Sequence, residues 1–218
     1  MESLNWGSIF FIPNSFDFDL TFTYLYNKRI DMANNMTTNF SIKGNEKLMN
    51  YLEGKKTEVD NGDDCYLSFV EAFYDEIKND RVWFTDNVGA KWCYSEEFWV
   101  DGGEAEITLI SAWYIPIELI EKLYEVCSKI DPNCVITGTY EDESYSPVGG
   151  FVVDENGFNS EEEELEYPNI DDFIGEDGEV NYTLYESTEE DFYNNLWEIK
   201  ERLKEEAISN SKLIETEN

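Results

Sequence analysis

The chain has 218 residues, of which 41% are hydrophobic and 16% aromatic, a composition typical of a globular protein rather than a disordered one. It carries 15 Lys and Arg against 49 Asp and Glu, so its formal net charge is −34, and it contains no histidine. The charge excludes nucleic acid and anionic membranes as direct partners by repulsion, and the lack of histidine excludes histidine-dependent nucleophilic and general-base catalysis.

The first 31 residues predict a β-hairpin. Apolar residues alternate with Asp and Thr from Phe16 to Tyr24, which indicates a half-buried strand. The segment Leu4–Ile12 can pair with it across a turn at Pro13–Ser15. No run of 18 apolar residues is present, so we expect no membrane span. The N-terminus lacks a positively charged region followed by an apolar one, so we expect no signal peptide.

The next segment predicts one strand and two helices. Thr37–Ile42 indicates a strand, and Asn45 is a suitable N-cap for a short helix after it. We expect a polar loop over Gly54–Asp64. A second helix is expected over Tyr66–Ile77, because its apolar residues follow the helical period, with Asp63 or Asp64 as its cap.

Three strands are then expected, over Arg81–Phe84, Lys91–Tyr94 and Glu104–Trp113. The helix that follows is signalled by several independent features. Pro116 suits the first helical position, where a missing N–H costs nothing. Leu119, Ile120, Leu123, Val126, Cys127 and Ile130 then form one apolar stripe. Asp131-Pro132 ends the helix, because proline cannot continue it.

A strand over Val135–Tyr140, an acidic turn at Glu141–Glu143 and a strand over Val148–Val153 come next. Asn156-Gly157 is a strong hairpin-turn signal at the end of the second strand. The cysteines show no C-x-x-C pair, and we interpret them as reduced core thiols rather than a zinc site. They are Cys65, Cys93, Cys127 and Cys134.

Four segments between Met32 and Gly157 resemble motifs of a known family. They are Met32-Ala-Asn-Asn-Met-Thr-Thr-Asn-Phe-Ser-Ile-Lys-Gly, Val88-Gly-Ala-Lys-Trp-Cys, Ile110-Ser-Ala-Trp-Tyr-Ile-Pro, and Tyr140-Glu-Asp-Glu with Gly149-Gly150. Together they are similar to the YubB-type ferredoxin-like domain family of phages and plasmids, although Val88 and Tyr114-Ile115 depart from its pattern. The resemblance implies a ferredoxin-like fold and a mobile-element origin. The family has no established activity, so no residue inherits a role from it.

The composition changes after Gly157. An acidic run occupies Ser160–Glu166, and the alternation of Val180, Tyr182 and Leu184 indicates a strand. Ser187-x-x-Glu190 is a capping box that predicts a helix to about Ala207. That helix would place Phe192, Leu196, Ile199 and Leu203 on one face, with Trp197 beside them. We expect the last ten residues to be frayed.

These elements predict an α+β fold with a ferredoxin-like antiparallel sheet and helices on one face. An N-terminal β-hairpin would precede it, and an acidic extension ending in a helix would follow. The expected domains are an N-terminal extension at residues 1–31, a ferredoxin-like domain at 32–157 and an acidic extension at 158–218.

The distribution of charge is the strongest functional signal. Between Ile130 and Ile199 there are 21 Asp and Glu and no Lys or Arg. Such a block repels itself, so we interpret it as a mimic of nucleic-acid charge that pairs with the Arg and Lys of a DNA- or RNA-binding protein. The predicted partner-binding residues are Glu141, Asp142, Glu143, Asp154, Glu155, Glu161, Glu162, Glu163, Glu164, Glu166, Asp171, Asp172, Glu176, Asp177 and Glu179. Interleaved aromatic residues would supply apolar anchors; they are Tyr140, Tyr145, Phe158, Tyr167, Phe173, Tyr182 and Tyr185.

Other chemistry is less well supported. Asp60-Asn-Gly-Asp-Asp and Asp154-Glu-Asn-Gly place oxygen ligands near glycine, but neither matches the twelve-residue calcium loop. One of Glu141–Glu143 could have the raised pKa of a glycosidase acid, but adjacent acids in a turn are usually solvated. We therefore expect a protein that is not an enzyme and needs no metal or other cofactor.

The predicted function is a cytoplasmic inhibitor of a basic, nucleic-acid-binding host defence protein, such as a CRISPR effector or a restriction enzyme. The link to host defence is an analogy with other phage and plasmid proteins. The alternative is a mobile-element accessory domain that binds an unknown protein and is acidic only incidentally. Reversing Glu161–Glu164 to lysine should separate the two, because only mimicry predicts a large loss of binding.

Overall fold

A computed structural model describes residues 34–62, 67–78, 80–175 and 178–217, with side chains as far as Lys212. The expected N-terminal hairpin therefore lies outside the described residues. Asn34–Asn218 forms one compact unit. This unit is α+β, as predicted, and is built around one antiparallel sheet.

The sheet has six strands in the order β2-β3-β1-β4-β5-β6, and all neighbouring strands are antiparallel. The strands are β1 (Asn35–Lys43), β2 (Cys93–Asp101), β3 (Glu104–Ala112), β4 (Val135–Asp142), β5 (Val148–Asp154) and β6 (Gly157–Glu163). In β1 every second residue is buried, because successive side chains point to opposite faces of the sheet. One face of the central strands is therefore apolar and the other is polar.

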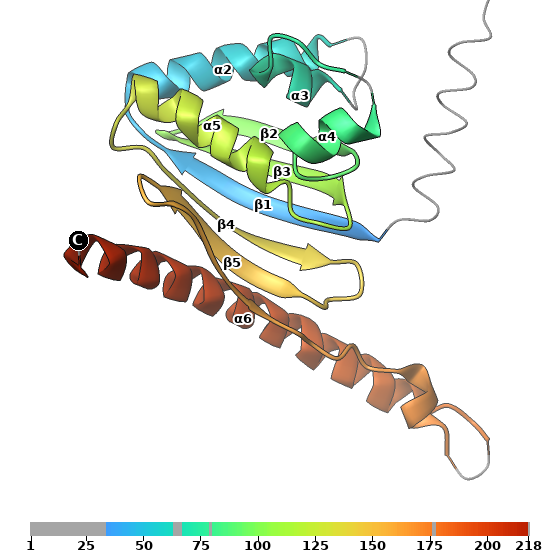
Figure 1. The fold of residues 1–218 in the computed structure, drawn as a ribbon. Helices are drawn as coiled ribbons and strands as arrows, with labels where there is room; N and C mark the ends of the chain where they lie inside the picture. Colours follow the sequence, from blue (N-terminus) through green and yellow to red (C-terminus); the bar gives the residue numbers. More distant parts are fainter. Residues whose placement is uncertain (1–33, 63–66, 79, 176–177, 218) are drawn as a thin grey trace, which may run out of the picture. The chain divides into compact units, whose positions relative to one another are not determined.

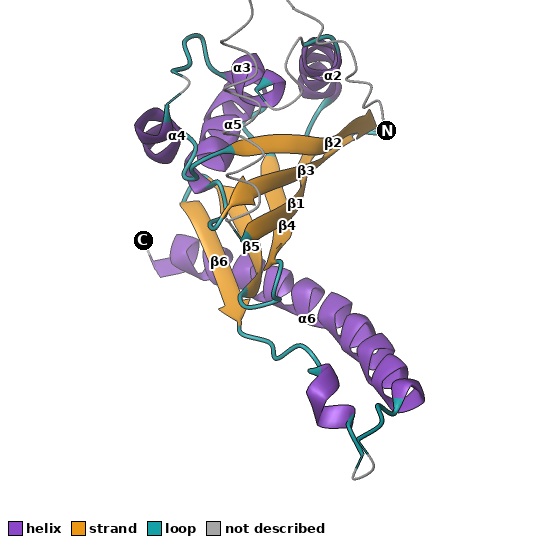
Figure 2. Ribbon diagram, turned by 90° about the vertical axis from the view of Figure 1, so that its right-hand side faces the viewer, coloured by secondary structure: helices purple, strands orange, loops and turns teal. Residues whose placement is uncertain are grey.

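Helices lie on both faces of the sheet (Figures 1 and 2). They are α2 (Glu46–Asp60), α3 (Ser68–Phe73), α4 (Arg81–Asn87), α5 (Ile117–Ile130) and α6 (Tyr182–Glu217), with a 3-10 turn, η1, at Ile170–Phe173. The helices α2 to α5 gather on the apolar face, whereas α6 crosses the opposite face over β4, β5 and β6. The molecule thus has three layers over β4–β6.

The main core lies between the sheet and helices α2, α3 and α5. Leu119, Ile120 and Leu123 of α5 are fully buried against Phe69 of α3 and Phe151 of β5, among others. The predicted apolar stripe of the helix is confirmed except at Val126, which is half-buried and lies outside this cluster. Burial of a large aliphatic or aromatic side chain contributes about 2 kcal/mol, so this layer supplies most of the driving force for folding.

Helix α6 rests directly on β5, and a glycine makes this approach possible. A Cβ at Gly150 would lie 2.0 Å from the backbone nitrogen of Lys204 in α6, which no real structure tolerates. Around this contact, Val148 of β5 packs with Leu196 and Leu203 of α6 in a second, smaller core. The strand β5 is therefore buried on both faces, unlike β1.

Several predicted elements are confirmed. β1 and β5 cover the expected strands, and β4 covers Val135–Tyr140 and continues to Asp142. Asn45 caps α2 as predicted, since its side chain accepts a hydrogen bond of 3.1 Å from the backbone N–H of Leu48. Pro116 is the N-cap of α5 rather than its first helical residue. The three cysteines among the described residues are free and buried, as expected.

Four predictions in the first half of the chain are wrong in type or in their bounds. Arg81–Phe84 begins helix α4 instead of forming a strand, because Asp80 accepts a hydrogen bond of 2.8 Å from Trp83 N–H and caps a helix there. The expected loop after Gly54 is helical to Asp60. The expected helix over Tyr66–Ile77 ends at Phe73, where the backbone becomes extended. Lys91 precedes β2, which begins two residues later and runs much further than expected.

The C-terminal helix is longer than predicted at both ends. It begins at Tyr182, so the expected strand over Val180–Leu184 is wrong. Asn181, not Ser187, makes the capping hydrogen bond, and accepts it from Leu184 N–H over 3.1 Å. Ser187 lies inside the helix and donates to a backbone carbonyl. The helix also continues through the residues expected to fray, and Ser211 is buried there.

Candidate acidic partner-binding surface

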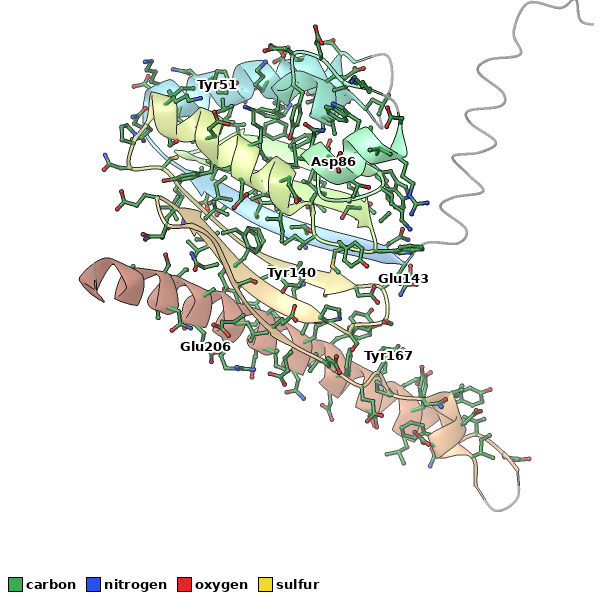
Figure 3. All side chains as sticks on the ribbon, viewed as in Figure 1. Tyr51, Asp86, Tyr140, Glu143, Tyr167 and Glu206 are labelled. Atoms are coloured by element: carbon green, nitrogen blue, oxygen red, sulfur yellow. The ribbon has the colours of Figure 1, made fainter. Side chains whose placement is uncertain are left out.

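The acidic residues expected as a turn after β4 have three different environments. Glu141 is half-buried and forms an ion pair of 2.9 Å with Lys200 of α6. Asp142 is buried, and its carboxylate accepts hydrogen bonds from the backbone N–H and the hydroxyl of Ser144. Only Glu143 is exposed, and it accepts a hydrogen bond of 3.1 Å from the N–H of Asn35 (Figure 3). Glu141 and Asp142 therefore hold the fold together rather than face a partner.

The acidic run after Gly157 begins as a strand, β6, that was not predicted. Its three glutamates all bind other elements of the protein. Asn210 of α6 donates to Glu161 over 2.8 Å, and Arg202 of α6 lies 2.5 Å from Glu163. Glu162 points to the other face and accepts a hydrogen bond of 3.0 Å from Tyr140. Burial and this carboxylate raise the pKa of Tyr140.

The two acids of the β5–β6 hairpin also differ. Asp154 accepts hydrogen bonds from Asn156 N–H, over 2.8 Å, and from the hydroxyl of Ser211 in α6. Glu155 is exposed. Asp154 therefore anchors the C-terminal part of α6, and Glu155 remains available on the surface.

One sequence signal could have revealed these anchoring roles. Lysine and arginine stop at Lys129 and resume at Lys200, and the cations that resume are all on α6. Within a strongly acidic region, an isolated cation is expected to pair with a carboxylate nearby in space. Lys200, Arg202 and Lys204 all do so.

The remaining predicted acids that the structure describes are exposed. They are Glu164, Glu166, Asp171, Asp172 and Glu179. They lie on the segment between β6 and α6, which includes η1. Glu176 and Asp177 lie outside the described residues. We name residues 164–181 the acidic linker.

A stripe of acids on α6 was not among the predicted site residues. Asp191, Glu198 and Glu205 are exposed and follow one another at intervals of seven residues. At that interval side chains share one face of a helix and are about 10 Å apart along its axis. This face points away from the sheet, because Leu196 and Leu203 occupy the buried side. We name these three residues the outer acidic stripe.

An aromatic cluster holds the acidic linker against α6. Tyr167 of the linker stacks on Tyr145 with ring centroids 5.4 Å apart and packs edge-on against Phe192 of α6 at 5.1 Å (Figure 3). The hydroxyls of Tyr145 and Tyr167 approach that of Tyr193, and Tyr167 donates a hydrogen bond to Glu189. Four of the predicted aromatic anchors thus pack inside the molecule. Tyr145 and Tyr167 do so in this cluster, and Tyr140 and Phe158 pack against Phe151 in the main core. The start of the linker, at Tyr167, is consequently fixed to the N-terminal part of α6.

Two tyrosines predict how stability responds to alkaline pH. The hydrogen bond with Tyr193, together with burial, raises the pKa of Tyr145 to about 12, and burial raises that of Tyr74 to about 12. The unfolded pKa is about 10, so the folded state holds these protons more tightly. Their contribution to stability is complete below pH 10 and is lost as the pH rises through 12.

We therefore expect the denaturant midpoint to fall between pH 10 and pH 12. Guanidinium unfolding followed by circular dichroism at a series of pH values measures it. The Tyr145→Phe variant keeps the ring contacts but removes one of the phenols whose pKa is raised, so its midpoint should fall less steeply. A midpoint that does not change over this range would contradict the raised pKa values of these phenols.

Other kinds of site find no support in the described part of the chain. No group of three or more Cys, Asp or Glu residues there is arranged to hold a metal ion. None of the helices described is both long enough and apolar enough to cross a membrane.

No protein-family model, no curated protein and no solved structure matches this chain.

Proposed function

We propose that this chain is a non-enzymatic inhibitor that binds a basic, nucleic-acid-binding host defence protein in the cytoplasm and occupies its DNA or RNA channel. A CRISPR effector or a restriction enzyme is the expected kind of partner. The observation that carries the proposal is the exposed charge of the outer acidic stripe and of four acids in the acidic linker, none of which forms an ion pair in the described part of the chain. The four are Glu164, Glu166, Asp171 and Asp172. The three cations in the middle of α6 are already paired, so they do not neutralise the stripe.

The physical basis of the inhibition is charge presented on a rigid support. Helix α6 has 36 residues and is therefore about 54 Å long. Its contacts with β5 and β6 keep the carboxylates at set distances, so a partner's Arg and Lys side chains meet an ordered array of negative charge. Pairing with such an array resembles pairing with a phosphate backbone. Binding should accordingly weaken as the salt concentration rises.

We further propose that β1, α2, β2, β3, α5 and β4 form a ferredoxin-like unit. The strand order β2-β3-β1-β4, with α2 and α5 on the same face, supports this assignment. The motif resemblance to the YubB-type family supports a mobile-element origin, and the link to host defence depends on that origin. The elements β5, β6 and α6 would then be additions that carry the acidic surface.

A second function has one specific observation in its favour. Glu141, Glu161 and Glu163 are engaged within the molecule, so part of the acidity serves the fold. This favours an accessory protein-binding domain with incidental acidity. It also rules out reversal of Glu161–Glu164 as a test, because that change would detach α6 whether or not the protein is a mimic.

The outer acidic stripe provides a cleaner test. The triple variant Asp191→Lys, Glu198→Lys, Glu205→Lys changes only exposed residues, so the fold should persist. We expect it to bind nucleic-acid-binding proteins from a host lysate about a hundredfold more weakly than the parent at low salt, because close charge pairs at interfaces couple strongly. Quantitative mass spectrometry of the proteins retained on the immobilised chain gives the measurement.

A matched control reverses the charge of three exposed glutamates on the helices that cover the opposite face of the sheet. Glu53→Lys, Glu71→Lys and Glu121→Lys change the net charge equally but lie on α2, α3 and α5. This control should lose much less binding than the stripe variant. Equal losses in the two variants would show that net charge alone matters and would favour the accessory-domain function.

A further inference from the structure

The sheet face that carries α6 is only partly covered. Helix α6 contacts β4, β5 and β6, and no other described element crosses the strip formed by β2, β3 and β1 on that face (Figure 2). A cleft of about 390 Å³ lies between this strip and α6. Its floor consists of small polar side chains, namely Asn39, Ser41, Thr108, Thr137 and Thr139.

The floor contains a hydroxyl, that of Thr139, which is open to the cleft. Asn39 lies between Thr108 of β3 and Thr139 of β4 in the strand register, and the Thr108 hydroxyl donates to it over 2.8 Å. The Thr139 side chain is only 8% exposed and forms no hydrogen bond with any other described residue. Because the Thr139 hydroxyl lines the cleft and is not sealed from solvent, it is available to hydrogen-bond a polar group of a ligand there.

The walls of the cleft are acidic. Glu97 of β2 and Glu106 of β3 lie on one side and pair with no Lys or Arg in the described part of the chain. Lys204, on the opposite wall, is already paired with Glu201 over 2.6 Å. The cleft thus has an excess of negative charge and favours a cationic ligand.

An exposed tryptophan narrows the choice of cation. Trp99 is 63% exposed and is the register partner of Glu106, so the indole and the carboxylate stand side by side on the same face. Together with Asp101 and Glu104, they line a second hollow that continues from the cleft. A guanidinium stacks on an indole and pairs with a neighbouring carboxylate through its planar fork, whereas an ammonium makes only a point contact.

We propose that this cleft binds an arginine side chain carried by a basic, extended segment of a protein partner. The guanidinium stacks on Trp99 and pairs with Glu106, and the segment's backbone or a polar side chain hydrogen-bonds Thr139. This deepens the proposed function by naming the group recognised, and it rests on that proposal only in taking the partner to be a basic protein. The cleft is separate from the outer acidic stripe, which lies on the far side of α6.

The test uses the full chain and a fluorescein-labelled peptide in which arginine alternates with glycine. Binding is followed by fluorescence anisotropy at low salt. We expect Glu106→Gln and Trp99→Leu each to weaken binding about tenfold, since each removes one half of the guanidinium site. Thr139→Val removes only a hydroxyl and should weaken it about threefold. Both Glu106 and Trp99 are exposed, so these variants should fold.

The control is Glu71→Gln on α3, which removes the same charge on the other face of the sheet and should leave affinity nearly unchanged. A second arm replaces every arginine by lysine, and a third uses spermidine as competitor. Preference for the arginine peptide supports the proposal. Equal binding of the lysine peptide, or equal weakening by Glu106→Gln and Glu71→Gln, would overturn it in favour of unspecific charge attraction.

This experiment contains no nucleic-acid-binding protein, so its outcome is independent of the partner's identity. Peptide binding that depends on Trp99 would stand even if the lysate experiments showed no nucleic-acid-binding partner. Conversely, a partner sensitive only to the outer acidic stripe, combined with no peptide binding, would retain the proposed function and reject the arginine site.

Discussion

Replacing Gly150 with alanine is expected to detach helix α6 from the sheet. The new methyl group would lie 2.0 Å from the Lys204 backbone nitrogen and 2.4 Å from its Cα, and a helix backbone cannot rotate away as a side chain can. Either α6 moves outward or β5 bends. We expect a loss of about 3 kcal/mol in the free energy of unfolding, at the upper end of overpacking costs.

Two measurements test this prediction. Denaturant unfolding gives the change in stability, and limited proteolysis reports whether α6 has become accessible. Gly54→Ala is the matched control, because it makes the same chemical change in helix α2 with no atom within 4 Å of the new Cβ. That variant should gain up to about 1 kcal/mol from helix propensity. A Gly150→Ala protein as stable and protease-resistant as its parent would contradict the close packing of α6.

Reversal of the charge at Lys200 should have the next largest effect on the free energy of unfolding. Lys200→Glu would place two carboxylates together at a contact where the present side chains are only 14% and 22% exposed. Loss of a partly buried ion pair, with repulsion in its place, should cost about 2 kcal/mol, less than for a fully buried pair. Thermal unfolding at low ionic strength measures this change.

An exchange of the two charges separates pairing from general destabilisation. The double variant Glu141→Lys, Lys200→Glu restores opposite charges and should recover much of the lost stability. Lys122→Glu breaks a more exposed pair with Glu125 on α5 and should cost less than about 1 kcal/mol. If the exchange recovered nothing, the contact of Lys200 with Glu141 would contribute little to holding α6.

The elements that could be predicted are those whose signals lie within a few residues. Helix α5 is such a case, because its apolar stripe, its dipole-matched charges and the proline at its start are all local. The alternation in β1 was equally local. Helix α4 was mistaken for a strand because four residues rich in apolar side chains fit both patterns, and the capping role of Asp80 decided between them.

The candidate site was less predictable, because its arrangement depends on distant contacts. Glu163 pairs with Arg202 across 39 positions, and Asp154 binds Ser211 across 57. The number of Asp and Glu residues after Ile130 indicates a charged region. It does not distinguish the carboxylates that hold α6 from those that face solvent. The outer acidic stripe can be identified only when the buried face of α6 is known. That face is set by the contact of α6 with Gly150.

The most direct test of the proposed function is competition by nucleic acid. The chain is immobilised, host lysate is applied at low salt, and increasing amounts of duplex DNA or RNA are added before the retained proteins are identified by mass spectrometry. Mimicry predicts that a nucleic-acid-binding defence protein is retained and is displaced by the added nucleic acid, because both occupy the same channel. Retention that is indifferent to nucleic acid, or no retention of any nucleic-acid-binding protein, would contradict it.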